Sequence, residues 1–384
     1  MALGGDLSEA FRSETVRGVR GFFRVGQARE GAWWLIDPEG RAFFAAAVNE
    51  VEAGEAERMR RWNFNALGAG AAEELRGDGW PWVGTVDFCA AGPTIRAAGV
   101  RLPDVFDPQW HERAGERAAE VCAPWVEERA LIGWLADDGI AWGRAGPTLL
   151  QVCLSLEPGF AAYHAAWEFV LALHRGSMAG LAKAWGAPIA NKEVVREMTR
   201  ADEALATRGY ARDNARWTRE FAQRYFATTA AAIRANDANH LVLGAREEPG
   251  AGAHEVNVSE LAAAVADVAW VGFRDGGMLP AGPVWVGDFC WAREEFFGAA
   301  GVRRAGGLTT VERMLRKGRR ELQRTIAHPA VVGCAWVRWR DRAGERAPLG
   351  SGLVRADGTE AREHTELVAD IQRRIGSLRS FSAS

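Results

Sequence analysis

Short apolar runs bounded by turn residues recur along the whole chain, and the segments between them show a different periodicity. Each run has the length of a buried strand. Two of the intervening segments, 110–122 and 217–225, repeat large or apolar residues at every fourth position, which is typical of helices with one buried face. Asp107 and Pro108 are suited to begin the first of these helices as N-cap and first helical residue. The strand-like runs span residues 42–49, 64–68, 82–88, 131–137, 240–245, 267–273, 284–289 and 331–336.

Eight buried strands that alternate with helices predict an α/β fold with a parallel sheet, and at this count a closed (β/α)₈ barrel of the TIM type. Two shorter runs, 21–27 and 32–37, come before the first strand and predict an N-terminal β-hairpin. The stretch 139–239 is too long for one helix, so we expect a helical insertion after the fourth strand, over the mouth of the barrel. The predicted organisation is a hairpin cap at 1–40, a barrel at 41–376 and a frayed tail at 377–384.

Composition and charge narrow the possible partners. The formal net charge is -3 and basic residues are interspersed with acidic ones, so we expect neither nucleic acid nor an anionic membrane surface as a partner. Five cysteines without a Cys-x-x-Cys pair predict buried free thiols, and seven histidines without ligand spacing predict no metal site. The chain has no glycine-rich nucleotide-binding motif, so we expect no cofactor. Without an apolar signal segment or a run of about 18 apolar residues, we expect a cytoplasmic protein.

Tryptophan is unusually frequent, with 17 Trp against 3 Tyr. Most of these side chains are expected to fill the core. Trp134 and Trp285 in particular alternate away from the direction of a barrel pocket. Flat indole faces also stack on the apolar faces of sugar rings, so a tryptophan near a strand end is a candidate for carbohydrate binding.

Two strand-like runs bring carboxylates to their carboxyl ends. The run Pro283-Val284-Trp285-Val286-Gly287-Asp288-Phe289 predicts a buried strand that ends near Asp288, and the run from 131 ends in Asp138-Gly139. Active sites of (β/α)₈ barrels lie at the carboxyl ends of the strands. Asp138 and Asp288 are therefore the candidate catalytic residues, and we expect them to share one pocket.

Motifs spread over nearly the whole chain carry a resemblance to a known family. They are Phe22-Phe23-Arg24-Val25, Trp33-Trp34-Leu35-Ile36-Asp37-Pro38-Glu39-Gly40, Ala47-Val48-Asn49, Trp62-Asn63-Phe64-Asn65, Leu102-Pro103-Asp104-Val105-Phe106-Asp107-Pro108 and Asn239-His240-Leu241-Val242-Leu243-Gly244 with Arg246. Together they resemble the agarase-like enzymes of clan A, the large clan of retaining (β/α)₈ β-glycoside hydrolases. The resemblance implies a barrel whose pocket takes an oligosaccharide or glycoside ligand, and an activity that hydrolyses O-glycosyl bonds.

The resemblance also shows where this chain departs from the family. Such enzymes use a Glu after the fourth strand to protonate the leaving oxygen and a Glu after the seventh as the nucleophile, about 5–5.5 Å apart. Residues 131–143 match the fourth-strand motif on both sides, yet Gly139 stands at the acid position and Asp138 at that of an Asn that binds the sugar 2-hydroxyl. Asp288 replaces the nucleophile. Candidate substrate-binding residues are Trp336, which matches the family's pocket floor, then Trp142, Asn49, Arg246 and Arg338.

Two interpretations follow from these departures. In the first, a degenerate barrel binds a carbohydrate without hydrolysing it, or serves as a structural or regulatory partner. Gly139 has no proton to give, and a shorter nucleophile arm misplaces the carboxylate by about 1 Å, which can cost about 10² in rate. Asp288 then pairs with an arginine such as Arg246 or Arg338.

In the second interpretation, Asp138 and Asp288 are the acid and base of an active hydrolase on a β-linked oligosaccharide. Two short carboxylates stand farther apart than two Glu, toward the roughly 6.5–9.5 Å of inverting enzymes. Glu247 or Glu248, just past the fifth strand, could instead supply a relocated acid, although a solvated loop is the simpler interpretation.

Overall fold

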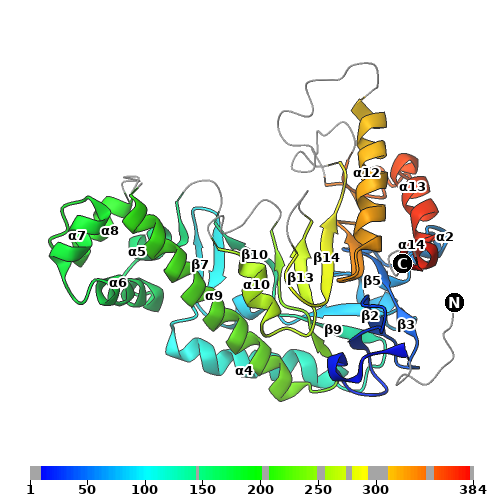
Figure 1. Ribbon diagram of the computed structural model, residues 1–384, viewed down its shortest axis with the longest axis horizontal. Coiled ribbons are helices and arrows are strands. Elements are labelled where there is room, and N and C mark those ends of the chain that lie inside the picture. Colours follow the sequence, from blue (N-terminus) through cyan, green and yellow to red (C-terminus); the bar gives the residue numbers. More distant parts are fainter. Residues whose placement is uncertain are drawn as a thin grey trace.

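The computed structural model describes residues 10–143, 147–200, 207–248, 256–273, 279–292, 310–342 and 350–380 (Figure 1). Its centre is an eight-stranded parallel sheet with the strand order β11, β9, β6, β5, β4, β15, β14, β13. All eight strands lie within the runs predicted from the sequence, so that prediction is confirmed. The bounds are β4 (Ala45–Val48), β5 (Ala66–Leu67), β6 (Trp82–Thr85), β9 (Leu131–Leu135), β11 (Leu241–Val242), β13 (Ala269–Gly272), β14 (Val284–Phe289) and β15 (Val331–Trp336).

Backbone hydrogen bonds also link the two ends of this strand order. Asp267 N donates to Val242 O at 2.8 Å, and Trp270 N donates to Leu243 O at 3.0 Å. The sheet is therefore curled until its first and last strands meet, an arrangement consistent with a TIM-like barrel.

Side chains fill the inside of the curled sheet. Trp270 and Trp285 stack there with ring centroids 5.3 Å apart. The stack requires Gly287, because a Cβ at this residue would lie 2.1 Å from Trp270 Nε1. Trp134 and Trp285 are both buried, as predicted, but Trp285 faces the inside of the sheet and not away from it as expected. Because the inside is packed, the polar groups described below lie at its carboxyl end.

Helices cover the outside of the sheet. The N-cap prediction for α4 is confirmed, since the Asp107 side chain accepts from Gln109 N at 2.9 Å. The aromatic stripe predicted at 217–225 is buried on α9, which lies alongside α4. These helices are α2 (Ala56–Arg61), α3 (Glu73–Arg76), α4 (Pro108–Cys122), α9 (Arg208–Asn236), α10 (Val258–Ala263), α12 (Thr310–Ala327) and α13 (Arg362–Gln372). None of the described helices is both long and apolar enough to cross a lipid bilayer.

Two smaller sheets flank the curled sheet. At the N-terminus, β1 (Arg24–Gln27), β2 (Trp33–Ile36) and β3 (Ala42–Phe43) pair antiparallel. The other sheet has the order β12 (Arg246–Glu247), β10 (Asp138–Trp142), β8 (Val100–Pro103) and β7 (Thr94–Ala97). The run that begins in β9 thus leaves the curled sheet after Leu135 and continues as β10. Parallel pairing of β10 with β12 places Asp138 opposite Arg246.

Four helices separate β10 from α9. They are α5 (Leu149–Ser155), α6 (Ala161–Leu173), α7 (Met178–Trp185) and α8 (Lys192–Arg200). In Figure 1 they lie at one side of the molecule, next to β7 and the N-terminal half of α9, and not across the ends of β13 and β14. The expectation that this segment covers the mouth of the barrel is therefore wrong. Apolar residues of these helices pack against α9, so the helices lie beside the sheet and not over its end.

The prediction of a frayed tail is also wrong for residues 377–380. Residues 377–380 belong to helix α14 (Ile375–Ser380), and residues 381–384 lie outside the described part of the chain. The helix is held by Arg379, which is buried and donates to Ile326 O at 2.9 Å, Val331 O at 2.8 Å and Trp33 O at 2.6 Å. Burial lowers the pKa of Arg379 to about 10. One guanidinium thus ties the chain end to the start of β15 and to the N-terminal sheet.

Candidate active site

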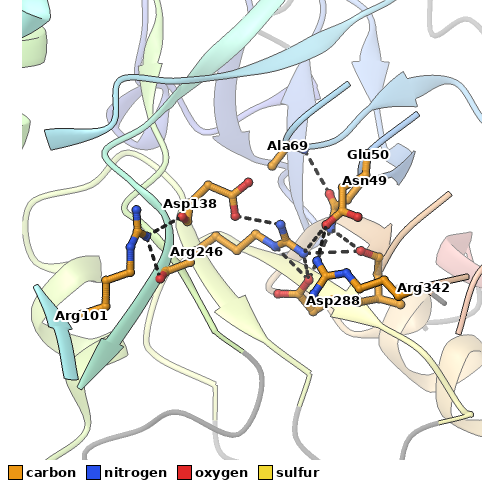
Figure 2. Close-up of polar contacts among 10 residues, drawn as sticks. Asn49, Glu50, Ala69, Arg101, Asp138, Arg246, Asp288 and Arg342 are labelled. Carbon is orange, nitrogen blue, oxygen red and sulfur yellow. Dashed lines mark hydrogen bonds and ion pairs between the residues drawn. The ribbon is translucent and has the colours of Figure 1, made fainter. Parts of the chain in front are cut away.

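A cluster of charged residues lies where several strands end (Figure 2). Asn49 and Glu50 follow β4, Asp138 begins β10, Arg246 begins β12, and Asp288 lies near the end of β14. We call Asn49, Glu50, Asp138, Arg246 and Asp288 the Arg246 cluster. The structure therefore brings together Asp138, Asp288, Asn49 and Arg246, which the sequence analysis had placed in one pocket.

Arg246 holds both candidate catalytic carboxylates. Its Nε and Nη2 atoms donate to Asp288 Oδ1 at 2.9 and 2.7 Å, and its Nη1 atom donates to Asp138 Oδ1 at 2.7 Å. The side chains of Arg246 and Asp288 are only 8% and 6% exposed, whereas Asp138 is 28% exposed. Burial lowers the pKa of Arg246, but the two carboxylates outweigh burial and raise it above its usual range. The guanidinium is therefore a permanent cation that pairs with both aspartates.

Asn49 fixes Asp288 from the other side. Its Nδ2 atom lies 3.4 Å from Asp288 Oδ1, and its Oδ1 atom accepts from Ala69 N at 3.1 Å. Asn49 is fully buried, and Gly68 makes room for it, since a Cβ there would lie 2.1 Å from Asn49 Oδ1. All the hydrogen bonds that Asp288 accepts from Arg246 and Asn49 thus end on one carboxylate oxygen.

Left-handed backbone conformations occur at this end of the sheet. Asp288 has φ 57°, Glu50 φ 59° and Asp87, which follows β6, φ 63°. Residues other than glycine in this region typically cost about 1–3 kcal/mol each, and such strain tends to gather at functional sites. At Asp288 the left-handed residue coincides with a register shift between β14 and β15, so it also re-aims the carboxylate.

Position 139, which the sequence analysis predicts to be the acid position, carries no side chain, and its backbone is suited to glycine. Gly139 has φ 82°, and Arg101 Nη1 donates to the carbonyls of Asp138 at 2.9 Å and Gly139 at 2.8 Å. A Cβ at Gly139 would lie 3.8 Å from Glu248 Cγ. Glu247 forms part of β12, and both it and Glu248 are half-buried, so they do not form the fully solvated loop of the simpler interpretation.

Two predicted sugar-binding tryptophans lie in the core. Trp336 is 3% exposed, and its Nε1 atom donates to Ser351 O at 2.8 Å. Its ring packs edge-on against Trp291, with the ring centroids 4.7 Å apart. Trp142 is 2% exposed and packs among aromatic residues of α9. Stacking needs an open ring face, so neither placement matches the prediction. Arg338 is buried beside Val337, whose carbonyl lies 3.4 Å from both Asn49 Nδ2 and Arg246 Nη2.

Two residues of this region, Glu50 and Asp137, escaped the sequence analysis. Glu50 lies 3.8 Å from Arg246 Nη2 and 3.5 Å from Arg342 Nη2. Asp137 is buried, accepts from Tyr225 Oη at 2.6 Å and Cys89 N at 2.8 Å, and has its pKa raised to about 7 by burial. For Glu50 a signal existed, since an acidic residue directly follows the first predicted strand. Within the described ranges, no group of three or more His, Cys, Asp or Glu side chains is placed to hold a metal ion.

Comparison with known proteins shows which sequences and folds this chain resembles. No family model matches the chain. A sequence search finds β-agarase A of Vibrio sp. (strain JT0107), 27% identical over 211 residues that make up 49% of this chain and 21% of that protein. Among solved structures, an exo-β-agarase matches with a TM-score of 0.71 and 18% identity over 94% of this chain and 66% of that one. The agarase AgWH50C matches with a TM-score of 0.69 and 17% identity over 97% and 69%.

The chain has an agarase-like fold. It spans only about a fifth of the length of the curated β-agarase. At these identities the structural likeness shows the fold, and function has to be argued from the site.

Proposed function

We propose that this protein is a carbohydrate-binding barrel that has lost the retaining two-carboxylate chemistry of the enzymes it resembles. The proposal rests on the residues at the two positions where the family has its catalytic glutamates. Position 139 has no side chain, and Arg246 donates hydrogen bonds to both Asp288 and Asp138. The agarase-like fold and the sequence similarity to a β-agarase support a carbohydrate-active ancestry and a sugar as the ligand.

Loss of the acid removes one part of the mechanism. A positioned general acid contributes about 10² to 10⁴ in rate. The backbone at Gly139 has a left-handed φ of 82°, which a glutamate adopts only with strain.

The arrangement of the two aspartates removes another part of the hydrolytic mechanism. A glycosidic bond must lie between the acid and the nucleophile or base, but here one guanidinium lies within hydrogen-bond distance of both carboxylates. Arg246 Nη1 donates to Asp138 Oδ1 at 2.7 Å, so this carboxylate oxygen already has a partner other than a glycosidic oxygen. An inverting mechanism with Asp138 and Asp288 would require Arg246 to move out of this position.

One observation favours a second candidate function, an active hydrolase. The Glu248 side chain runs beside the empty acid position, with its Cγ atom 3.8 Å from where a Cβ of Gly139 would lie. The carboxyl group of Glu248, the residue after β12, would then replace the missing acid, with Asp288 as the nucleophile.

Binding and hydrolysis measured on the same preparation separate these functions. We expect agarose oligosaccharides or other β-linked oligosaccharides to bind in calorimetric titrations and to remain uncut. Aryl β-glycosides with good leaving groups do not need protonation, so slow turnover of these alone would mean that Asp288 still attacks. Efficient hydrolysis of an unmodified oligosaccharide would overturn the proposal. Loss of that activity in Asp138→Asn or in Glu248→Gln would then identify the acid.

A further inference from the structure

Glu50 lies at the open side of the Arg246 cluster, and Gly70 lies between it and Asp138. A Cβ built on Gly70 would be 3.5 Å from Glu50 Cγ and 4.0 Å from Asp138 Oδ2. The two side chains therefore border the same space, although they follow different strands. Figure 2 shows Glu50 and Asp138 on either side of the Arg246 guanidinium.

Both carboxylates keep an oxygen available for a ligand. Asp138 uses Oδ1 to accept from Arg246, and Glu50 Oε1 is the oxygen nearest Arg246 and Arg342. In the part of the chain that the structure describes, Asp138 Oδ2 and Glu50 Oε2 accept no hydrogen bond. The side chains are 28% and 34% exposed, in contrast to the buried Asp288. They are thus the carboxylates of the cluster that a ligand from solvent reaches first.

We propose that Glu50 and Asp138 accept hydrogen bonds from two neighbouring hydroxyl groups of one bound sugar, above Gly70. The inference rests on the proposed carbohydrate-binding function and assigns Glu50 as a residue that determines specificity. A carboxylate oxygen is an acceptor only, so the matching ligand group is a donor, and vicinal hydroxyls of a sugar supply two donors at adjacent carbons.

Gly70 is a requirement of this site. Its φ is 70°, and any side chain would enter the space between the two carboxylates. Asparagine tolerates the left-handed conformation better than other side chains, so Gly70→Asn fills the space with little strain. Gly79 gives a matched control, because its φ is 75° and a Cβ there meets nothing within 4 Å.

The experiment measures sugar binding by calorimetry in the full chain and in three variants. The probe is the agarose or other β-linked oligosaccharide that the wild type binds most tightly. Glu50→Gln keeps size and shape but removes the charged acceptor, and hydrogen bonds to charged groups contribute enough that we expect affinity to fall about 10- to 100-fold. Gly70→Asn should weaken binding at least about tenfold by the same reasoning, whereas Gly79→Asn should stay within about twofold.

A second measurement separates a ligand contact from an indirect effect. Analogues of the probe that lack single hydroxyl groups should bind the wild type more weakly at one position, and that difference should vanish in Glu50→Gln. Folding is checked by urea unfolding; the ion pairs of Glu50 are long, at 3.8 and 3.5 Å, and Glu50 itself is 34% exposed, so stability should change little. Equal affinity of wild type, Glu50→Gln and Gly70→Asn would overturn this inference alone. If the wild type binds no oligosaccharide of the series, the proposed function fails and the inference with it.

Discussion

Replacing Arg246 by methionine tests the central electrostatic argument. The variant keeps a side chain of similar length but removes the cation. Asp288, which is 6% exposed, then loses two hydrogen bonds at 2.9 and 2.7 Å and keeps the contact from Asn49 Nδ2 at 3.4 Å. Asp138 loses one partner at 2.7 Å but is 28% exposed, so water replaces it.

The magnitude follows from these exposures. Removing one partner of a buried pair leaves an uncompensated charge and costs about 3–5 kcal/mol. The partly exposed Asp138 adds no more than about 1 kcal/mol. We therefore expect Arg246→Met to lower the free energy of unfolding by about 3–5 kcal/mol, a large part of the roughly 5–15 kcal/mol of a typical domain.

Urea unfolding at pH 7, followed by tryptophan fluorescence, measures this change. Arg224→Met is the matched control, because Arg224 lies on the surface of α9 with a 54% exposed side chain paired to Glu220. It should shift stability by less than about 0.5 kcal/mol. Adding Asp288→Asn to Arg246→Met should recover part of the loss, since the buried charge is gone.

A loss below about 1 kcal/mol at pH 7, or the same loss in the double variant, would refute the claim that Arg246 neutralises a buried Asp288.

Three further predictions concern other parts of the molecule. Burial raises the pKa of Asp137 to about 7 in the folded state, from about 4 in an unfolded chain. The free energy of unfolding of the wild type should therefore fall by up to about 4 kcal/mol relative to Asp137→Asn as the pH rises from 4 to 7. Parallel stability-against-pH curves from urea unfolding would contradict this. Gly139→Glu should destabilise by about 1–2 kcal/mol through its left-handed φ, and Gly139→Asn by less; equal urea midpoints of the two variants would show that the backbone relaxes. Arg379→Ala should cost about 3 kcal/mol, because two buried carbonyls and one partly buried carbonyl lose a charged donor. Calorimetric unfolding with the exposed Arg373→Ala as control tests whether α14 is held by Arg379.

Local pattern was enough to predict the strands and two of the main helices. A buried strand needs only a short apolar run between turn residues, so all eight strands of the curled sheet could be located from the sequence. The N-cap of α4 and the buried stripe of α9 were equally local, since each depends on residues within a few turns of one helix. The strand-like runs also placed Asp138 and Asp288 at the carboxyl edge of the sheet, because parallel strands of one sheet end at the same edge.

Contacts between segments far apart in the sequence decided which side chains meet at the site and which are buried in the core. Which arginine pairs with Asp288 depends on β12 lying beside β10, a pairing of residues more than a hundred positions apart. Trp336 is in the core because Ala335, the preceding residue of β15, faces the inside of the sheet, and neighbouring residues of a strand point to opposite faces. The approach of Glu50 to Asp138 above Gly70 likewise arises only when β4 and β10 are brought together. The sequence thus determines which residues are apolar, acidic or free of a Cβ, while the register of strands far apart in the chain decides which of them meet.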